Sequence, residues 1–420
     1  MKRRSGDAIT WLLGGATALC LAALVSLLGL LAAAGVEPLW SASVSELQLR
    51  DGQVLLGEIV AVEDGAIALR TSETDRIGEA YRRISSTDIV ARSQPQDAIT
   101  ITLVDGRRLF GRDRGSSAQA LLGSASKPAA VLDTLHPNAP GFFGRGGVFL
   151  RNVGRFLGTS PSSSNLAGGV LPALIGTVVL VLLMSILVMP FGVATAIYLH
   201  QRHGAGLRFV RAAINTLAGV PSIVYGVLGL GLFVHGIGAG IDHWFYADRL
   251  PVPTFGSGGL LWAALTLALL TVPVVVVSVE EGLARIPASL RDGSLALGAT
   301  RDETLWRLLL PAARPALLTG LIFAIARAAG AVAPLMLVGV VKLAPALPID
   351  ASFPYLHPSR QFMHLGFAVY DAALASSDTI RGVPRAYACA ALLVAVVIAL
   401  NLSAILLRNR LRERYRSLEN

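Results

Sequence analysis

Long apolar runs recur along the chain and are separated by polar segments. Residues 8–36 contain no charged side chain, and five later runs are nearly as apolar. An apolar helix of about 20 residues is long enough to cross the hydrocarbon core of a bilayer. The pattern therefore predicts six transmembrane helices, at residues 8–36, 169–199, 212–234, 259–279, 316–341 and 386–407.

Composition and charge agree with a membrane protein. Apolar residues make up 53% of the chain and charged residues 15%, which is too apolar for a soluble protein of 420 residues. The net charge of +9 comes largely from basic clusters that flank the apolar runs on alternate sides. Because this is the positive-inside pattern, we expect both termini in the cytoplasm and no nucleic-acid partner. The two cysteines lie in apolar runs, which favours neither a disulfide framework nor a metal cluster.

The first apolar run must be weighed against a secretory signal peptide, because it follows Lys2, Arg3 and Arg4. It has 29 residues, whereas the apolar region of a signal peptide has roughly 7–15. No clear cleavage site follows it. We therefore expect residues 1–36 to form a cytoplasmic N-terminus and a retained first helix.

Residues 37–165 differ from the rest, because acidic and basic residues balance and polar positions alternate with apolar ones. Together with Asp-Gly turns, this pattern predicts a β-rich domain, which the topology places outside the cytoplasm. The stretch from Leu49 to Gly57 recurs from Leu103 to Gly111, which predicts two equivalent β-hairpins in a small barrel-like fold. Residues 115–164 are rich in Gly, Ser and Pro, so we expect a loop on the membrane-facing side.

A polar segment separates the fourth and fifth predicted spans. Pro287 suits the first turn of a helix, and Gly298 suits the left-handed residue that ends one. Thr300 and Glu303 have the spacing of a capping box. These features alone would also fit an amphipathic connector on the membrane surface. The two predicted helices are residues 288–297 and a second that begins near Arg301.

The spacing within this segment resembles the EAA loop of ABC importer permeases, which is Glu-Ala-Ala, three residues, Gly, nine residues and Ile-x-Leu-Pro. Here Asp292-Gly293-Ser294 precedes Gly298, and Leu308-x-Leu310-Pro311 follows it. Gly293, where the family has Ala, costs about 1 kcal/mol in a helix. The resemblance implies that residues 283–311 form a short cytoplasmic coupling helix that docks in a cleft of an ATPase subunit. The residues assigned to this coupling loop are Arg291, Asp292, Gly293, Ser294, Gly298, Ala299, Leu310 and Pro311.

One charge lies inside a predicted span. Arg327 is the only charged residue between Arg314 and Lys342, and it lies about 20 Å along the helix from the cytoplasmic end. A central Arg costs roughly 2.5–3.5 kcal/mol, so it needs a partner or a wet cavity. No other predicted span carries an Asp or Glu, which leaves backbone carbonyls, a residue of another subunit, or a transported anion. The planar guanidinium suits phosphate because it can donate paired hydrogen bonds to two oxygens.

The sequence around Arg327 narrows the resemblance. Residues 321–335 are similar to the fifth-helix signature ARAxGExAPL of the PstA phosphate permease family, and residues 219–226 are similar to its AGVPSIVxG motif. The resemblance covers about residues 166–410. Ala331 stands where the family has a Glu one helical turn beyond the Arg. The residues that the resemblance assigns to the substrate path are Arg327, Ser222 and Tyr225.

The expected fold is an all-α polytopic membrane protein of six transmembrane helices, with a small β-rich periplasmic domain inserted after the first helix. The expected domains are residues 1–36, 37–165, 166–410 and a basic cytoplasmic tail at 411–420. The resemblance implies a bacterial inner-membrane permease for inorganic phosphate, with a PstC-like subunit, two PstB-like ATPases and a periplasmic phosphate-binding protein as partners.

The chain has no Walker A sequence, so we expect no cofactor on it and no enzyme activity, with ATP and Mg²⁺ held by the partner ATPases. A permease for sulfate or molybdate remains an alternative, because an Arg binds any tetrahedral oxyanion. A stand-alone anion transporter or channel would need an ion or proton relay, and a membrane enzyme would need clustered His or carboxylates. Copurification of an ATPase would separate the importer from both.

Overall fold

A computed structural model of the chain describes residues 6–40, 43–63, 65–71, 81–103, 108–113, 131–138, 142–161, 168–202, 204–375 and 379–416. The chain divides into two compact units, and each is described by itself. The first unit comprises Met1–Leu171 with Val369–Ala391, and the second comprises Pro172–Ala368 with Leu392–Asn420.

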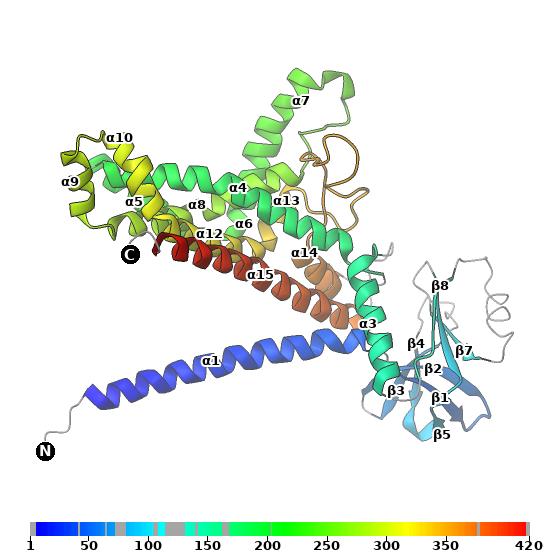
Figure 1. Cartoon of the computed structure of the whole chain (residues 1–420). Coiled ribbons are helices and arrows are strands. Elements are labelled where there is room, and N and C mark those ends of the chain that lie inside the picture. The colour runs from blue at the N-terminus through cyan, green and yellow to red at the C-terminus, as the bar shows by residue number, and fades with distance from the viewer. Residues whose placement is uncertain are drawn as a thin grey trace, which may run out of the picture. The chain divides into compact units, whose positions relative to one another are not determined.

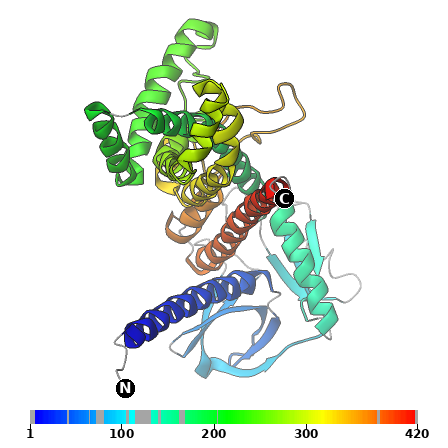
Figure 2. The ribbon, with the colours of Figure 1, turned by 60° about the vertical axis from the view of Figure 1, so that its left-hand side comes forward.

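The strands of the first unit, coloured blue to cyan in Figures 1 and 2, form two antiparallel sheets. The strand order is β4-β3-β2-β1-β5 in the larger sheet and β7-β6-β8 in the smaller one. Leu47 of β1 and Leu69 of β3 are fully buried and belong to the same apolar core. The bounds are β1 Val44–Leu49, β2 Val54–Glu63, β3 Ala66–Arg70, β4 Tyr81–Ser85, β5 Ile89–Ser93, β6 Ala98–Leu103, β7 Arg108–Arg112 and β8 Val131–Leu135.

The repeated sequence forms equivalent strand pairs. β1 and β2 make an antiparallel hairpin whose turn contains Gly52 at φ +82°, and β6 and β7 also pair antiparallel. The Asp105-Gly106 turn predicted for the second hairpin lies outside the described residues. Within the described ranges the strands form two sheets, and Val44 of the larger sheet shares an apolar core with Ala98 and Phe110 of the smaller one; the barrel-like fold stays a prediction.

The predicted loop at 115–164 is wrong for most of its described residues, because they form β8 and the helix α3, Phe142–Gly158; residues 115–130 lie outside the described ranges. β8 pairs with β6 across about thirty residues, a contact that local composition does not reveal. In α3, Phe149 packs on Trp40 with ring centroids 5.3 Å apart. Asn152 also donates a hydrogen bond to the Leu39 carbonyl at 3.0 Å. Tertiary contacts therefore hold a helix in a glycine-rich sequence.

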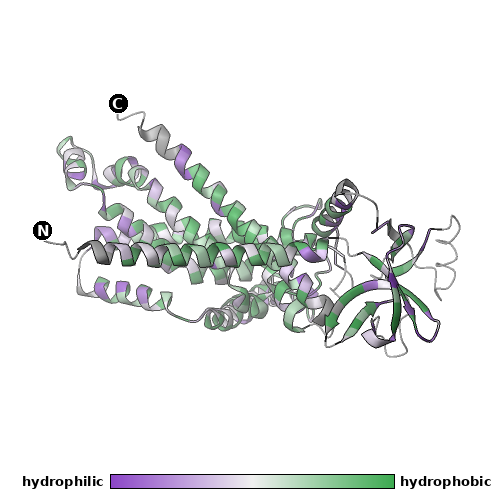
Figure 3. Cartoon of the chain, turned by 90° about the horizontal axis from the view of Figure 1, so that it is seen from below, coloured by the Kyte–Doolittle hydropathy of each residue, from purple (hydrophilic) through white to green (hydrophobic). Residues whose placement is uncertain are grey.

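Long apolar helices make up most of the rest of the chain, and Figure 3 shows that hydrophobic residues predominate on them. Four of the predicted spans are confirmed, namely the first, second, fourth and sixth. The fourth runs past Glu280 and Glu281, which were expected to follow it. The corresponding helices are α1 Gly6–Val36, α4 Leu171–Gln201, α8 Leu260–Ala284 and α15 Thr379–Arg416.

The third predicted span, residues 212–234, is wrong in its bounds. The chain breaks at Gly219 to Pro221, so that an amphipathic helix α5, Ala205–Ala218, ends before the spanning segment Ser222–Phe245 begins. Pro221 is extended at ψ 137° and has no N–H to continue the helix. The spanning segment consists of α6 Ser222–Gly229, a π-helical stretch Leu230–Gly238 and α7 Ala239–Phe245.

α7 carries a carboxylate that was not expected in a span. Asp242 is 2% exposed and accepts hydrogen bonds from the backbone N–H groups of Thr254, Phe255 and Gly256 at 2.7–3.0 Å. Three such donors replace the water that a buried carboxylate would lose. Asp242 therefore fixes the loop that leads from α7 to α8.

The fifth predicted span, residues 316–341, is also broken. α12, Arg314–Ala329, is followed by Ala331 at φ −88° and ψ 76°, and α13, Val332–Val338, begins after it. In a continuous helix the ring of Pro334 would clash with the carbonyl of Gly330, four residues earlier, so the helix ends there. α12 is bent by 61° from the helical stretch Arg301–Ala312. Among the described residues five helices are long and apolar enough to span a membrane, or six if this bent pair counts as one.

The second unit packs around a core formed by α4, α6, α8, α12 and α13. Small residues allow the close approach of its helices: a Cβ on Gly226 of α6 would lie 2.6 Å from the Cα of Pro334 in α13. The 219–226 motif thus allows close contact between α6 and α13, and it also contains the break between α5 and α6. α14, Leu365–Tyr370, follows the loop after α13.

Candidate functional site

The coupling-loop segment folds as a short helix, a tight turn and a second helical stretch. The first helix, α9, is Ala288–Ala296, and Pro287 precedes it as the N-cap residue instead of lying in its first turn. Gly298 has φ +89°, which confirms the left-handed position. The N–H of Gly298 donates to the carbonyl of Leu295, and that of Ala299 to the carbonyl of Ser294. Carbonyls at the end of α9 are thereby satisfied by the chain that follows directly.

The predicted capping box is confirmed. The backbone N–H of Glu303 donates to Thr300 Oγ1 at 3.2 Å, and the backbone N–H of Thr300 donates to Glu303 Oε2 at 3.0 Å. The hydrogen bonds from the backbone and side chain of Thr300 lower the pKa of the Glu303 carboxyl below its usual value. The helical stretch then continues through α10 Arg301–Glu303, a π-helical stretch Thr304–Leu309 and α11 Leu310–Ala312.

One face of this segment packs inward and the other is exposed. Leu305 and Leu309 are buried in the core of the second unit, while Leu297 is 91% and Trp306 63% exposed. Arg291, Asp292 and Gly293 are exposed as well, and Leu310 and Pro311 are half-buried where the stretch returns to the core. Large apolar side chains that protrude beside charged ones are typical of a protein-interaction surface.

Arg327 lies near the end of α12 and has a backbone partner. Its Nη2 donates a hydrogen bond to the carbonyl of Ala218, the last residue of α5, at 3.0 Å. Tyr225 on α6 lies at the same place, because its hydroxyl donates to the neighbouring Leu217 carbonyl at 2.7 Å. Of the three partners considered for Arg327, the structure shows the backbone carbonyl. The guanidinium has further N–H groups that could hold an anion.

The other two residues of interest here are placed differently. Ser222 begins α6 and is half-buried, and no hydrogen bond among the described residues joins it to Arg327. Ala331 is buried in the break between α12 and α13, in a non-helical conformation. A residue at this position therefore does not lie one helical turn beyond Arg327 on the same helix, which corrects the expected i,i+4 geometry.

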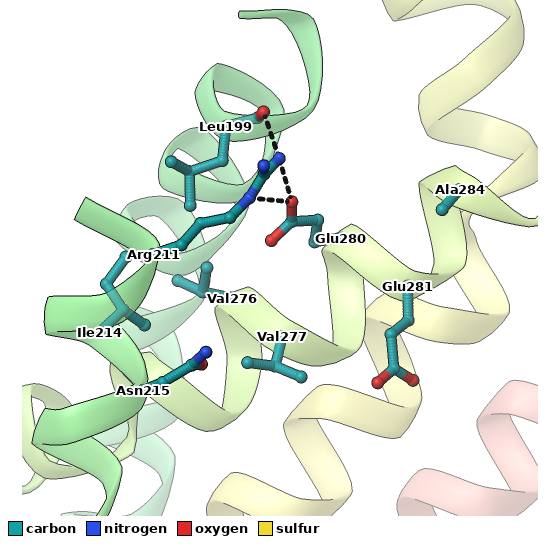
Figure 4. Close-up of a pocket in the computed structure, with 9 residues that line it drawn as sticks. All are labelled: Leu199, Arg211, Ile214, Asn215, Val276, Val277, Glu280, Glu281 and Ala284. Carbon is teal, nitrogen blue, oxygen red and sulfur yellow. Dashed lines mark hydrogen bonds and ion pairs between the residues drawn. The ribbon is translucent and has the colours of Figure 1, made fainter. Parts of the chain in front are cut away.

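Sequence reasoning missed an ion pair between α5 and α8. Figure 4 shows Arg211 of α5 reaching both Glu280 of α8 and the carbonyl of Leu199 in the last turn of α4. The Nε of Arg211 donates to Glu280 Oε1 at 2.8 Å, and its Nη2 donates to Leu199 at 2.9 Å. The pair borders a pocket of about 240 Å³ between α5 and α8, with Asn215 and Glu281 on its wall. Both residues stood next to predicted span ends, but nothing in the sequence pairs them.

Comparison with known proteins identifies the family of the chain. A probable ABC transporter permease protein, YqgH of Bacillus subtilis, is 33% identical over 47% of this chain and 60% of its own length. Phosphate transport system permease protein PstA 1 of Mycobacterium tuberculosis is 38% identical over 41% of this chain and 52% of its own length. The chain thus spans little more than half the length of these relatives.

A solved structure of the MetNI methionine ABC transporter is 19% identical, with a TM-score of 0.41, and covers 57% of this chain and 94% of its own. Residues 188–417, more than half of the chain, match the family described as binding-protein-dependent transport system inner membrane component. The chain therefore belongs to the family of inner membrane components of binding-protein-dependent transport systems.

Proposed function

We propose that this chain is a membrane permease subunit of an ATP-driven ABC importer for inorganic phosphate. The observation that carries the proposal is the similarity, at 36–38% identity, to relatives named phosphate transport system permease protein PstA. An intramembrane guanidinium supports it, because Arg327 offers charge-assisted hydrogen bonds where a phosphate crossing the bilayer has lost its water. We place Arg327 on the substrate path, with Tyr225 and Ser222 of α6 beside it.

The coupling-loop segment would transmit ATP hydrolysis to this path. Its exposed Leu297 and Trp306 would enter an apolar cleft of an ATPase subunit, with Arg291 and Asp292 at the rim. ATP and Mg²⁺ would be held by two such ATPase subunits, and this chain would hold no cofactor. A PstC-like permease subunit and a periplasmic phosphate-binding protein would complete the importer.

The proposed membrane topology has both termini in the cytoplasm and the β-rich domain outside. The basic clusters at the chain ends and in the coupling-loop segment motivate it. An alkaline phosphatase reporter fused after residue 127 should be active, whereas the same reporter fused after residue 419 should be inactive. The opposite result at either site would overturn the topology.

Uptake of radiolabelled phosphate tests the substrate. Cells that carry the complete importer should accumulate labelled phosphate, and a deletion of this chain should remove that uptake. Excess unlabelled phosphate should suppress it, whereas equal excesses of sulfate and molybdate should not. Suppression by sulfate or molybdate would favour an importer of another oxyanion, and uptake that persists without ATP would favour a stand-alone transporter.

A further inference from the structure

Polar side chains attach the helix α5 to the rest of the second unit at two places, one nearer its start and one at its C-terminal end. At its C-terminal end, Arg327 and Tyr225 donate to the last two carbonyls, those of Ala218 and Leu217. Nearer its start, Arg211 binds Glu280 and the Leu199 carbonyl. The helix is otherwise half exposed, with Phe209 76% exposed. Leu207 and Ile214 of α5 also pack against the core, and the two polar attachments fix the helix in addition to that packing.

The C-terminal attachment is electrostatic. The last carbonyls of a helix lack intrahelical partners, and the helix dipole places about half a negative charge there. The donors at this end are Tyr225 and Arg327, which lie 8 and 109 positions along the chain from the carbonyls that they bind. A guanidinium at such an end is attracted both by the dipole and by the hydrogen bond. The charge of Arg327 thus stabilises the position of α5.

The second attachment lies close to the coupling-loop segment. Glu280 is in the last turns of α8, which ends at Ala284, and α9 begins only four residues later at Ala288. The Oε1 of Glu280 lies 2.6 Å from Nη2 of Arg211, and the side chain of Glu280 is 24% exposed. The pocket of Figure 4 separates α5 from α8 beside this pair. Movement of α5 would therefore bear directly on the end of α8.

We propose that an anion bound at Arg327 displaces the C-terminal end of α5, and that Arg211 and Glu280 carry this displacement to the α8–α9 connection. The inference rests on the proposed function, because it takes the anion to be the transported one. An anion on the guanidinium neutralises the charge that attracts the Ala218 carbonyl. It also sets a negative charge beside the negative end of the α5 dipole. Both effects disfavour the arrangement in which Arg327 holds the end of α5. The anion therefore binds more tightly when that end is displaced.

Hydrogen–deuterium exchange of the full-length protein in its membrane complex, reconstituted in lipid nanodiscs, tests the proposal. The probe is inorganic phosphate, and the reporters are peptides that cover the last turn of α5 and the helix α9. In the wild type, phosphate should speed exchange at the end of α5 about tenfold, the factor expected for losing a hydrogen bond from a charged donor. Retention of radiolabelled phosphate on the same sample shows whether the anion is bound.

Three variants separate the steps. Arg327→Ala should show fast exchange at the end of α5 with and without phosphate, because the attachment is gone. Arg208→Ala, which removes an exposed arginine of the same helix, should behave like the wild type. Arg211→Gln should keep the phosphate response of α5 but lose any response of α9. The last variant distinguishes transmission through Arg211 from a general loosening of the unit.

The possible failures are distinguishable. Unchanged exchange of α5 in a wild-type complex that retains phosphate overturns the inference and leaves the proposed function standing. If the complex retains no phosphate, the proposed substrate is wrong. Exchange in Arg327→Ala without phosphate then tests whether Arg327 holds the end of α5. Slow exchange in Arg327→Ala under that condition overturns the attachment, and fast exchange supports it.

Discussion

Two helix ends in the second unit are completed in different ways. The end of α9 is completed by the residues that follow it at once, through the left-handed Gly298 and backbone hydrogen bonds from Gly298 and Ala299. The end of α5 also has local donors, because the N–H groups of Gly219 and Val220 bind the carbonyls of Thr216 and Leu217. Its last two carbonyls, those of Leu217 and Ala218, receive further donors from Tyr225 and Arg327 on other helices. One end is completed by local hydrogen bonds alone, and the other depends on tertiary contacts as well.

The difference matters for what each end can do. A locally capped end keeps its geometry whatever happens elsewhere, which suits a segment that must present one fixed surface to a partner. An end held by a distant charge changes when that charge finds another ligand. We therefore expect substitutions at the end of α9 to act as fixed structural defects. Substitutions at the end of α5 should act in a way that depends on the anion.

The largest effect at the local end is expected for Gly298→Val. A β-branched residue with positive φ is strained by about 1–2 kcal/mol, and a Cβ at this position meets nothing within 4 Å, so the cost is conformational. The second helical stretch should be misdirected, and phosphate uptake per ATP hydrolysed should fall about tenfold.

Gly293→Ala is the matched control, because it also adds a methyl group in open space but within α9. It should stabilise the helix by about 1 kcal/mol. Normal coupling in Gly298→Val would show that the turn is not needed.

Removal of the N-terminal cap should have a smaller effect. Thr300→Ala deletes the oxygen that accepts from the Glu303 N–H, which costs about 1 kcal/mol of helix stability. Hydrogen exchange in residues 301–312 should become roughly fivefold faster, with no change in the end of α5. Thr300→Ser keeps the hydroxyl and should behave like the wild type. A response in α5 as large as that in 301–312 would contradict the independence of the two ends.

Tyr225→Phe should weaken the remote end moderately. It removes one hydrogen bond to the Leu217 carbonyl, a loss of about 1 kcal/mol, while Arg327 remains in place. Phosphate uptake should stay within a few-fold of the wild type. A loss of uptake as complete as that expected without Arg327 would instead place the hydroxyl in contact with the anion.

The smallest effect concerns pH. The pKa of Glu303 is lower in the folded loop than in an unfolded chain, so its contribution is fully present above the ordinary value of about 4.3. It is lost as the pH falls through the lowered pKa. Hydrogen exchange in residues 301–312, corrected for intrinsic rates, should rise in that acid range in the wild type. Glu303→Gln should show no such step, and a step of the same size in that variant would assign it to another group.

Sequence patterns predicted the elements whose determinants are local. The turn at Gly298, the capping box at Thr300 and the first span each depend on residues within a few positions, and the structure confirms them. The break in the fifth span was missed, although Pro334 and Gly330 were visible, because the apolar pattern continues across it. The partner of Arg327 was left open because Ala218 is 109 residues away. β8 and the Arg211 to Glu280 pair were missed for the same reason.

The most direct test of the account is phosphate uptake by the complex that carries Arg327→Ala. The partner subunits should still copurify in normal amounts, because most of the packing of the unit lies in apolar helices. Uptake of labelled phosphate into proteoliposomes supplied with ATP should fall to background, and Arg327→Lys should restore little of it, since a single ammonium cannot donate paired hydrogen bonds in a planar fork. Normal uptake by an assembled Arg327→Ala complex would contradict the account and remove Arg327 from the substrate path.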